Sequence, residues 1–267
     1  MVRSRQSRSN WPFSNHRGCL FSGFGRHYFL QDPEFPKRLT RSGYYRTIDF
    51  LQTLFQKYAR SRLSVPADRN VAISGLIKRM EEVWDAKCRY GIFDICMHRL
   101  LLWRRQYKPG KPLVPAQDPE YRKEVPSWSW MVCSQIRFSS VKRLRVSPND
   151  ELHFDTGPGQ EESLRVQIRE LQECKIRQDG NKQIIVDEGN REVGCCWPDT
   201  KVDVTLKHCV VVAMDHSQGK RYLADAEKDY YVLFVKPQSG ENSFERIGAG
   251  SIKAHCVSLH NCKGRLV

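Results

Sequence analysis

The sequence predicts an α+β protein: a small helical layer over about residues 46–104, followed by a mainly β region. Hydrophobic residues recur at three- and four-residue intervals as far as Trp103. After Pro126, short runs of Val, Ile, Phe and Tyr are bounded by Gly, Pro, Asp and Asn instead. Helices followed by strands are typical of α+β architectures.

The chain divides into four parts. Residues 1–43 are rich in Arg, Ser, Gly, Phe and Pro without sustained periodicity, and we expect a poorly ordered or remnant segment. A helical region over 44–110 and a linker over 111–126 follow, and residues 127–267 form the β-rich region. With 267 residues, one or two domains are expected.

Three helices are expected, over roughly 46–62, 68–88 and 92–104. Thr47 and Asp68 are suited to cap the first two. The third helix ends before Pro109-Gly110. The apolar stripe of the second helix comprises Ile73, Leu76, Ile77, Met80, Val83 and Trp84.

After residue 127 we expect mainly strands. Residues 164–168 and 202–206 alternate between apolar and polar side chains, as half-buried strands do. Residues 209–214 and 230–235 are continuous apolar runs, typical of strands that are buried on both faces.

The net charge of +14 lies almost entirely in the first part of the chain. Residues 1–110 hold 21 Lys and Arg against 8 Asp and Glu, a net charge of +13, whereas the remainder is nearly balanced. Basic regions attract nucleic acid. Here, however, the basic residues alternate with apolar ones at helical spacing and no nucleic-acid module is present, so solvated helix faces are favoured.

Ten cysteines are spread along the chain without framework-like spacing or a secretory signal, which predicts reduced thiols in the cytoplasm. His255, Cys256, His260 and Cys262 form the one metal-like grouping. Its spacing matches no zinc module, so we expect no metal. No apolar run approaches the ~20 residues of a membrane-spanning helix, so no membrane contact is expected either.

The search for catalytic motifs is negative. The sequence has no phosphate-binding loop, dinucleotide fingerprint, nucleophile elbow or pair of metal-ligating histidines on a helix. We therefore predict no enzyme activity, no catalytic residue and no cofactor. His98 is interpreted as a structural or exposed helical residue. Asp199 and Asp203 are interpreted as turn formers.

The most specific feature is the string Pro126, Ser127, Trp128, Ser129, Trp130, in which two tryptophans lie two residues apart. On a strand, both rings would lie on one face and add a large apolar area to a core. We expect at least one of them to be buried against the second helix. This string resembles the hallmark that follows the helical segment in fungal heterokaryon-incompatibility domain proteins.

Further positions agree with that family in order and spacing. The Asp68-Arg69 pair followed by the Ala72 to Gly75 segment is similar to its "D-[KR]-x-x-A-I-S-G" motif. Gly91-Ile92-Phe93, followed later by Trp103, is similar to "G-L-W … L-L-W". The segment that holds Arg246 and Gly248 resembles "Y-x-R-[VI]-G". The resemblance spans about residues 44–250, and we interpret the motif residues as structural.

The resemblance implies a role in nonself recognition or vegetative incompatibility through protein contacts. Gly-Ile-Phe departs from the family's Gly-Leu-Trp, and the motifs of the N-terminal domain thought to induce cell death have no counterpart in this sequence. We therefore expect a truncated or degenerate member that covers the region after that domain, with an unidentified protein as its partner.

Two function classes remain as alternatives. A basic nucleic-acid-binding module would bind oligonucleotides with an affinity that falls steeply with salt. An undetected hydrolase would need a nucleophile, a base and an oxyanion donor that converge in one pocket.

Overall fold

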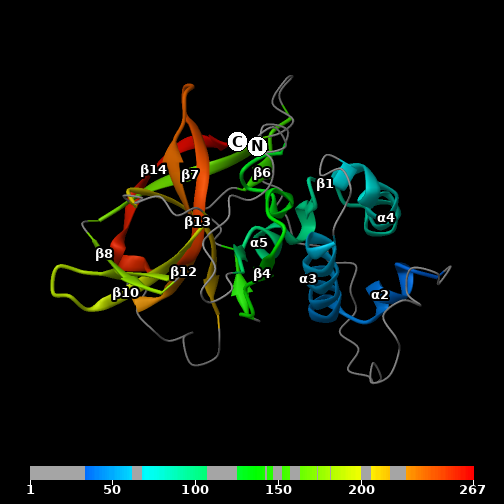
Figure 1. Cartoon of the computed structure of the whole chain (residues 1–267), viewed down its shortest axis with the longest axis horizontal. Coiled ribbons are helices and arrows are strands. Elements are labelled where there is room, and N and C mark those ends of the chain that lie inside the picture. The colour runs from blue at the N-terminus through cyan, green and yellow to red at the C-terminus, as the bar shows by residue number, and fades with distance from the viewer. Residues whose placement is uncertain are drawn as a thin grey trace, which may run out of the picture.

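The computed structural model describes residues 34–61, 68–106, 125–141, 143–146, 152–156, 163–172, 174–180, 182–199, 206–216 and 227–267. Within these ranges the predicted α+β class is confirmed, with helices first and a large sheet after them (Figure 1). The predictions for residues 1–33, for most of the linker, and for the strand at 202–205 with Asp203 fall outside the described ranges.

The helical layer consists of α2 (Lys37–Arg41), α3 (Tyr44–Arg60) and α4 (Asp68–Trp84). The predicted helices at 46–62 and 68–88 are thereby confirmed, while α2 lies in a segment for which no helix was predicted. The prediction that Thr47 caps the first helix is wrong. The chain reverses one turn earlier, at Gly43 with φ of 90°, so Thr47 lies inside α3 and its hydroxyl is 3.1 Å from the Leu39 carbonyl oxygen.

The third predicted helix, at 92–104, is wrong. Strands β1 (Cys88–Arg89) and β2 (Ile92–Phe93) form a hairpin instead, because Tyr90 and Gly91 both have positive φ, 47° and 76°, as a two-residue turn of this kind requires. One short turn, η1 (Asp94–Cys96), and one helical turn, α5 (Met97–Leu100), follow. The chain then extends into β3 (Trp103–Arg105), which pairs with β4 (Ile136–Phe138).

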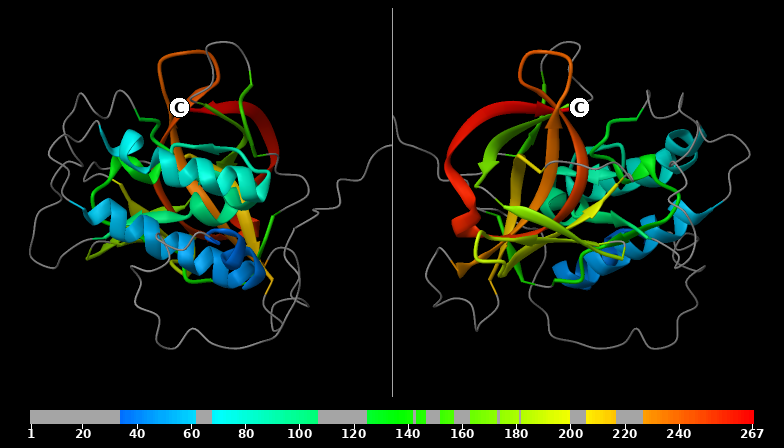
Figure 2. Two further views of the ribbon diagram at one scale, coloured as in Figure 1. Left: turned by 90° about the vertical axis from the view of Figure 1, so that its right-hand side faces the viewer. Right: turned by 60° about the vertical axis from the view of Figure 1, so that its left-hand side comes forward.

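Five strands form a closed ring, shown in the right-hand view of Figure 2. They are β7 (Leu164–Leu171), β11 (His208–Asp215), β12 (Asp229–Pro237), β13 (Ser243–Lys253) and β14 (Val257–Leu266). Strand β12 pairs with β11 on one side and with β13 on the other. Strand β14 pairs with β13 and β7, and β7 pairs with β11, which closes the circuit. All these pairs are antiparallel except β13 with β14.

Further strands extend the ring. The edge of β13 pairs with β10 (Glu192–Pro198), which continues through β9 (Lys182–Val186) to β8 (Lys175–Asp179). Two short strands, β5 (Leu144–Arg145) and β6 (His153–Phe154), add to β11 and β7. The turn η5 (Ala254–Cys256) separates β13 from β14.

Alternate residues of the ring strands contribute to two separate cores. In β11, Val210 and Val212 join the cluster that also contains the helical layer. Cys209 and Val211, on the opposite face, join a second cluster with β9 and β10. Because side chains alternate across a strand, a sheet that is covered on both faces requires the continuous apolar runs that the sequence shows. The site described below lies where the helical layer packs on the sheet, in the first of these two cores.

Two glycines of the helical region should respond oppositely to alanine. Gly75 lies inside α4 with open space around its missing Cβ, so Gly75→Ala should stabilise the protein by roughly 0.5–1 kcal/mol through helix propensity alone. Gly91 has φ of +76°, and a Cβ there would lie 2.5 Å from the Trp130 ring. Gly91→Ala should cost about 1–3 kcal/mol. Urea unfolding of both variants measures this, and equal effects would contradict it.

Candidate functional site at the helix–sheet junction

The tryptophan string does not form a strand, which corrects the prediction. Residues from Pro126 turn into a short 3-10 helix, η2 (Trp130–Val132). The Ser129 hydroxyl accepts a hydrogen bond from Met131 N at 3.0 Å and donates to the Tyr90 carbonyl at 2.8 Å. Local hydrogen bonds of this kind compete with strand pairing and cap a helical turn. The two serines thus set the backbone, and the tryptophans fill the core.

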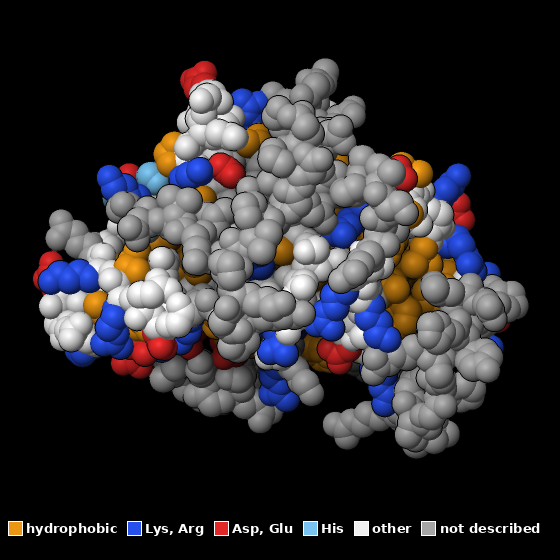
Figure 3. Space-filling model, viewed as in Figure 1, with side chains coloured by type: hydrophobic (Ala, Val, Ile, Leu, Met, Phe, Trp, Pro, Cys, Tyr) orange, Lys and Arg blue, Asp and Glu red, His pale blue; other side chains and the backbone are white. Residues whose placement is uncertain are grey.

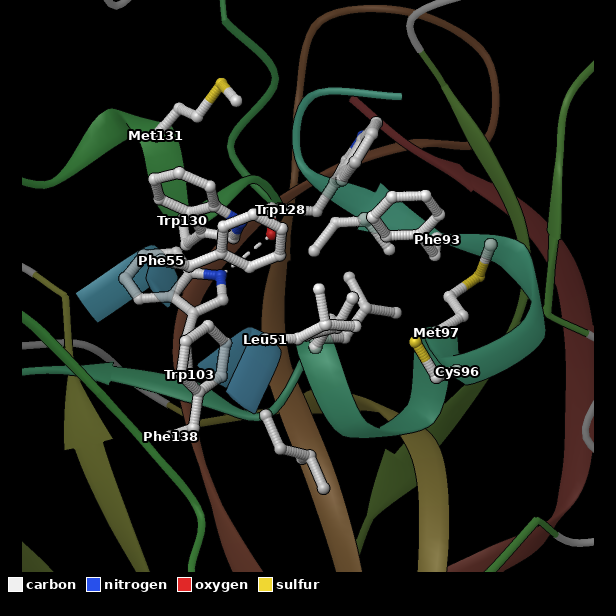
Figure 4. Close-up of a cluster of buried hydrophobic side chains, with 14 of the residues drawn as sticks. Leu51, Phe55, Phe93, Cys96, Met97, Trp103, Trp128, Trp130, Met131 and Phe138 are labelled. Carbon is white, nitrogen blue, oxygen red and sulfur yellow. Dashed lines mark hydrogen bonds between the residues drawn. The ribbon is translucent and has the colours of Figure 1, made fainter. Parts of the chain in front are cut away.

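Both tryptophans are fully buried, which confirms the burial prediction (Figure 4). The Trp130 ring stacks on Phe55 of α3 with centroids 4.8 Å apart, and its Nε1 donates to the Gly91 carbonyl at 3.0 Å. Trp128 meets Tyr90 edge-on at 5.9 Å. The closest described ring contacts of Trp130 are therefore with α3, while Ile73 and Met80 of the predicted α4 stripe belong to the same buried cluster.

Trp103 connects the two motifs that sequence reasoning treated separately. Its Nε1 donates to the Trp128 carbonyl at 2.9 Å, and its ring lies under the Arg246 guanidinium, whose Cζ is 3.5 Å from the ring centroid. A cation over an indole face is attracted by the ring's electron density. Trp103, Trp128 and Arg246 thus meet in one place although they are far apart in the sequence.

Arg246 is the centre of this junction. Its side chain is fully buried, and its Nε donates to Oδ2 of Asp199 at 2.9 Å. The other two guanidinium nitrogens donate to the main-chain carbonyls of Leu101 at 2.9 Å and Trp103 at 2.6 Å. A guanidinium presents a planar fork of donors, so one side chain from the sheet holds the backbone of the helical region at two points.

The charge of this buried group is balanced locally. Burial lowers the pKa of Arg246, and the Asp199 carboxylate acts in the opposite direction. An arginine nevertheless stays protonated in proteins, so the pair is an ion pair in a desolvated setting. Asp199 lies in a bend directly after β10, where its N–H donates to the Ile247 carbonyl at 2.8 Å, and beyond a role in that bend its carboxylate holds Arg246.

Two further motif residues complete the junction. The Ser127 hydroxyl accepts from Arg246 N at 3.0 Å and donates to the Val267 carbonyl, so the tryptophan string is fixed to β13 and to the end of β14. On α4, Arg69 is buried and donates to the Cys133 carbonyl at 3.3 Å, just beyond η2. Motif segments from α4, from the chain before η2 and from β13 therefore share one site.

Two glycines of the motifs, Gly75 and Gly248, lie in different parts of the structure. Gly248 lies in β13 beside β10, where a Cβ would be 2.8 Å from the Trp197 carbonyl oxygen and 2.9 Å from Cys196 Sγ. It therefore allows the two strands to approach closely. Gly75 lies apart from the junction, on the solvent-facing side of α4. Pro126 is buried, and its carbonyl accepts from Ser129 N at 3.0 Å.

Sequence reasoning missed Asp199 as a member of this site. Its partner is set by the pairing of Pro198 with Gly248, which places two residues 47 positions apart next to each other. A local pattern cannot reveal such a pairing. The one available signal was an acidic residue that directly follows an apolar strand.

The candidate metal ligands do not come together. Cys256 is buried at the end of η5, whereas His255, His260 and Cys262 are exposed. Within the described part of the chain, no group of three or more His, Cys, Asp or Glu side chains is arranged to hold a metal ion.

His98 lies on α5 and is largely buried. Its Nε2 is 3.3 Å from the Tyr44 hydroxyl, which anchors α5 to the start of α3. Burial, and secondly the nearby Arg99 charge, lower the pKa of His98 to about 4. Burial raises the pKa of Tyr44 to about 12. Both groups are neutral at pH 7, as the structural interpretation of His98 requires.

This shift predicts a stability that depends on pH. Between pH 6.5 and 4 the unfolded state binds a proton at His98 that the folded state does not, so the free energy of unfolding should fall as the pH decreases through this window, by about 2–3 kcal/mol. His98→Gln should flatten that part of the profile. An unchanged slope in this variant would show that His98 does not cause the loss. Urea unfolding at pH 4.5 and pH 7.5 measures the difference.

Comparison with known proteins adds no relative. No protein-family model matches this chain, and no curated protein or solved structure matches it either.

Proposed function

We propose that this chain is the non-catalytic C-terminal part of a heterokaryon-incompatibility-type protein and acts in fungal nonself recognition through protein contacts in the cytoplasm. The observation that carries the proposal is the convergence of the motif residues. Trp103, the string 126–130, Arg246 and Gly248 were selected from the sequence by resemblance alone. They lie in one buried junction that joins the helical layer to the closed ring.

A shared structural junction explains why a family would retain these residue types. The indole rings fill a core, the serines set the backbone, and the arginine fork requires two carbonyls and a carboxylate at fixed places. The guanidinium of Arg246 and the hydroxyls of Ser127 and Ser129 are bonded to other groups of the protein. This arrangement supports a role in which the fold presents a surface, rather than one in which these residues act on a substrate.

Two buried thiols support the same proposal. Burial raises the pKa of the Cys133 thiol, and burial raises the pKa of the Cys96 thiol above the usual range as well. A thiol with a raised pKa is a poor nucleophile at neutral pH. The described part of the chain has no helix long and apolar enough to cross a lipid bilayer.

The helical layer offers a surface for a partner. Residues 34–61 and 68–106 hold 14 Lys and Arg against 7 Asp and Glu. Among large hydrophobic side chains there, Val71 of α4 is 72% exposed and Tyr45 of α3 is 54% exposed. On the face in Figure 3, basic side chains and exposed hydrophobic side chains occur together over this part. Such a surface favours an acidic protein partner, because opposite charge steers association.

Inducible expression in a filamentous fungus tests the proposal. Residues 1–267 are expressed in one member of an incompatible pair of strains, and the fraction of dead fused cells is counted. We expect this fraction to change, while viability and NAD levels in unfused cells stay constant. Death or NAD loss in unfused cells would place an activity in the chain. An unchanged outcome in every pairing would contradict the proposed role.

A charge-reversal pair locates the surface. Arg46→Glu, Lys57→Glu and Lys78→Glu together reverse exposed charges of α3 and α4 and should abolish the effect on pairing. The matched control reverses three exposed charges of the sheet, with Lys175→Glu, Arg177→Glu and Lys263→Glu, and should retain it. The affinity for an oligonucleotide, measured between 50 and 200 mM salt, tests the alternative function as a nucleic-acid-binding module. A steep loss of affinity with salt would favour nucleic acid as the partner.

A further inference from the structure

The strand β8 lies at the end of the large sheet and has an open edge. Among the described residues it pairs with β9 alone, and all five residues of Lys175–Asp179 are exposed. Figure 1 shows β8 on the side of the sheet that faces away from the helical layer. An exposed strand edge presents N–H and C=O groups that can pair with another strand.

The geometry of the β8–β9 hairpin decides which backbone groups lie at the open edge. Asp179 pairs with Lys182 across a two-residue turn. The residues that flank such a turn bond each other, and the direction of the N–H and C=O groups alternates along an antiparallel strand. Arg177 and Asp179 therefore point these groups toward β9, whereas Ile176 and Gln178 point them outward.

The side chains of β8 carry charges that are not paired within the chain. Lys175, Arg177 and Asp179 lie on one face, because side chains alternate along a strand. None of the three forms an ion pair with a described residue. Ile176 lies on the opposite face and is 38% exposed. A second strand at this edge could therefore supply both counter-charges and a contact for the isoleucine.

A second copy of β8 can supply these counter-charges in one register. Three antiparallel registers centre the contact on Ile176, Arg177 or Gln178 and match outward groups with outward groups. Centred on Ile176, Arg177 of each copy faces Lys175 of the other. Centred on Arg177, the two arginines face each other. Centred on Gln178, Arg177 of each copy faces Asp179 of the other. Opposite charges stabilise a cross-strand pair and like charges destabilise it, which favours the third register.

We propose that two copies of this chain associate through β8, as an antiparallel strand pair centred on Gln178. Two ion pairs between Arg177 and Asp179 flank the centre. On the other face, Ile176 of each copy lies opposite Gly180 of the other, where the missing Cβ leaves open space for the isoleucine side chain. Charges at a sheet edge usually prevent pairing, so the need to match them makes this register specific.

The dimer is expected to be weak and sensitive to salt. A contact between two five-residue strands is smaller than the ~1,200 Å² of a stable interface, so association should occur only above about 10 µM. The ion pairs are exposed, and salt screens the attraction between them. The proposed function uses the surface of the helical layer and does not require this dimer, so either proposal can fail without the other.

Analytical ultracentrifugation of the full chain tests the dimer, with a reductant present to keep the exposed Cys262 thiol free. The weight-average mass should rise from 31.2 kDa toward twice that value as the protein concentration increases. Lys263→Glu changes an exposed charge of β14 and is the control, which should associate to the same extent. A mass that stays at 31.2 kDa at the highest concentration would overturn the proposal.

Two charge variants identify the register. Arg177→Asp makes both facing positions acidic, and Asp179→Arg makes both basic, so each variant alone should remain monomeric. Both positions are exposed, so the fold should be retained. An equimolar mixture of the two variants should form a heterodimer, because every acidic position then faces a basic one. Self-association of either variant to the extent of the unchanged chain, or a mixture that remains monomeric, would contradict the proposed register.

Hydrogen exchange measured by nuclear magnetic resonance tests the backbone pairing. The outward N–H groups of Ile176 and Gln178 should exchange more slowly at concentrations at which the dimer forms. The Arg177 N–H points toward β9 and should change less. If the mass doubles while exchange at Gln178 does not depend on concentration, the two copies associate through another surface and the proposal is wrong.

Discussion

Replacing Arg246 by alanine is expected to lower the free energy of unfolding by about 3–5 kcal/mol, because it removes the guanidinium that pairs with the largely buried Asp199 carboxylate at 2.9 Å. It also leaves the carbonyls of Leu101 and Trp103 without their donor. Urea unfolding at pH 7 measures the loss. Arg246→Lys should recover only part of it, since an ammonium cannot reproduce the planar fork.

A surface ion pair on the same strands provides the control. Lys236 on β12 and Glu245 on β13 lie 3.1 Å apart, and both side chains are accessible to solvent. Glu245 directly precedes Arg246 in the chain. Lys236→Ala should cost no more than about 1 kcal/mol. Equal losses for Arg246→Ala and Lys236→Ala would show that the junction contributes little beyond an ordinary surface contact.

A double-mutant cycle separates the ion pair from the carbonyl contacts. Asp199→Ala alone leaves a buried guanidinium unpaired, whereas the double variant removes both charges. The double variant should therefore be more stable than the sum of the single losses predicts, by roughly 1–3 kcal/mol. Strict additivity would mean that Arg246 acts through the carbonyls of the helical region alone.

The parts of the fold that local pattern determines were predictable. The α3 helix and the strands β7, β11 and β12 follow directly from periodicity, because each has one or two faces that are buried over most of its length. The segment from Ile92 to Trp103 was mistaken for a helix. It is mostly apolar, and the Tyr-Gly turn before it does not carry the Asn-Gly signature of a tight hairpin.

The closed ring and the site could not be predicted from local pattern. Strand β14 pairs with β7, nearly 100 residues away in sequence, and Arg246 meets Asp199 only because β10 pairs with β13. Similarly, Ser129 gives no local indication that it will bond Tyr90 rather than continue a strand. The sequence marked the motif residues one by one, but their mutual contacts depend on pairings that bring distant segments together.

The short string Pro-Ser-Trp-Ser-Trp contacts several layers of the fold at the junction. Four of its five residues have separate partners: Ser127 on β13, Trp128 on β3, Ser129 on the β1–β2 turn and Trp130 on α3. A substitution at any of these positions therefore disturbs a different contact between layers. This distribution lets one short string stabilise several layers of the fold at once.

Trp130→Ala is expected to cost about 3–5 kcal/mol of unfolding free energy, since it removes a fully buried indole that stacks on Phe55 and leaves the Gly91 carbonyl without its donor. Trp197 is the matched control. Its ring is half-buried under Arg104, with the guanidinium Cζ 4.2 Å from the centroid, so Trp197→Ala should cost clearly less. Trp130→Phe separates the two contributions, because it retains much of the apolar area but loses the N–H donor, and should lie between wild type and Trp130→Ala. Thermal and urea unfolding followed by far-ultraviolet circular dichroism measure all three variants. If Trp130→Ala unfolds at the same urea concentration as Trp197→Ala, the tryptophan string does not hold the helical layer on the sheet.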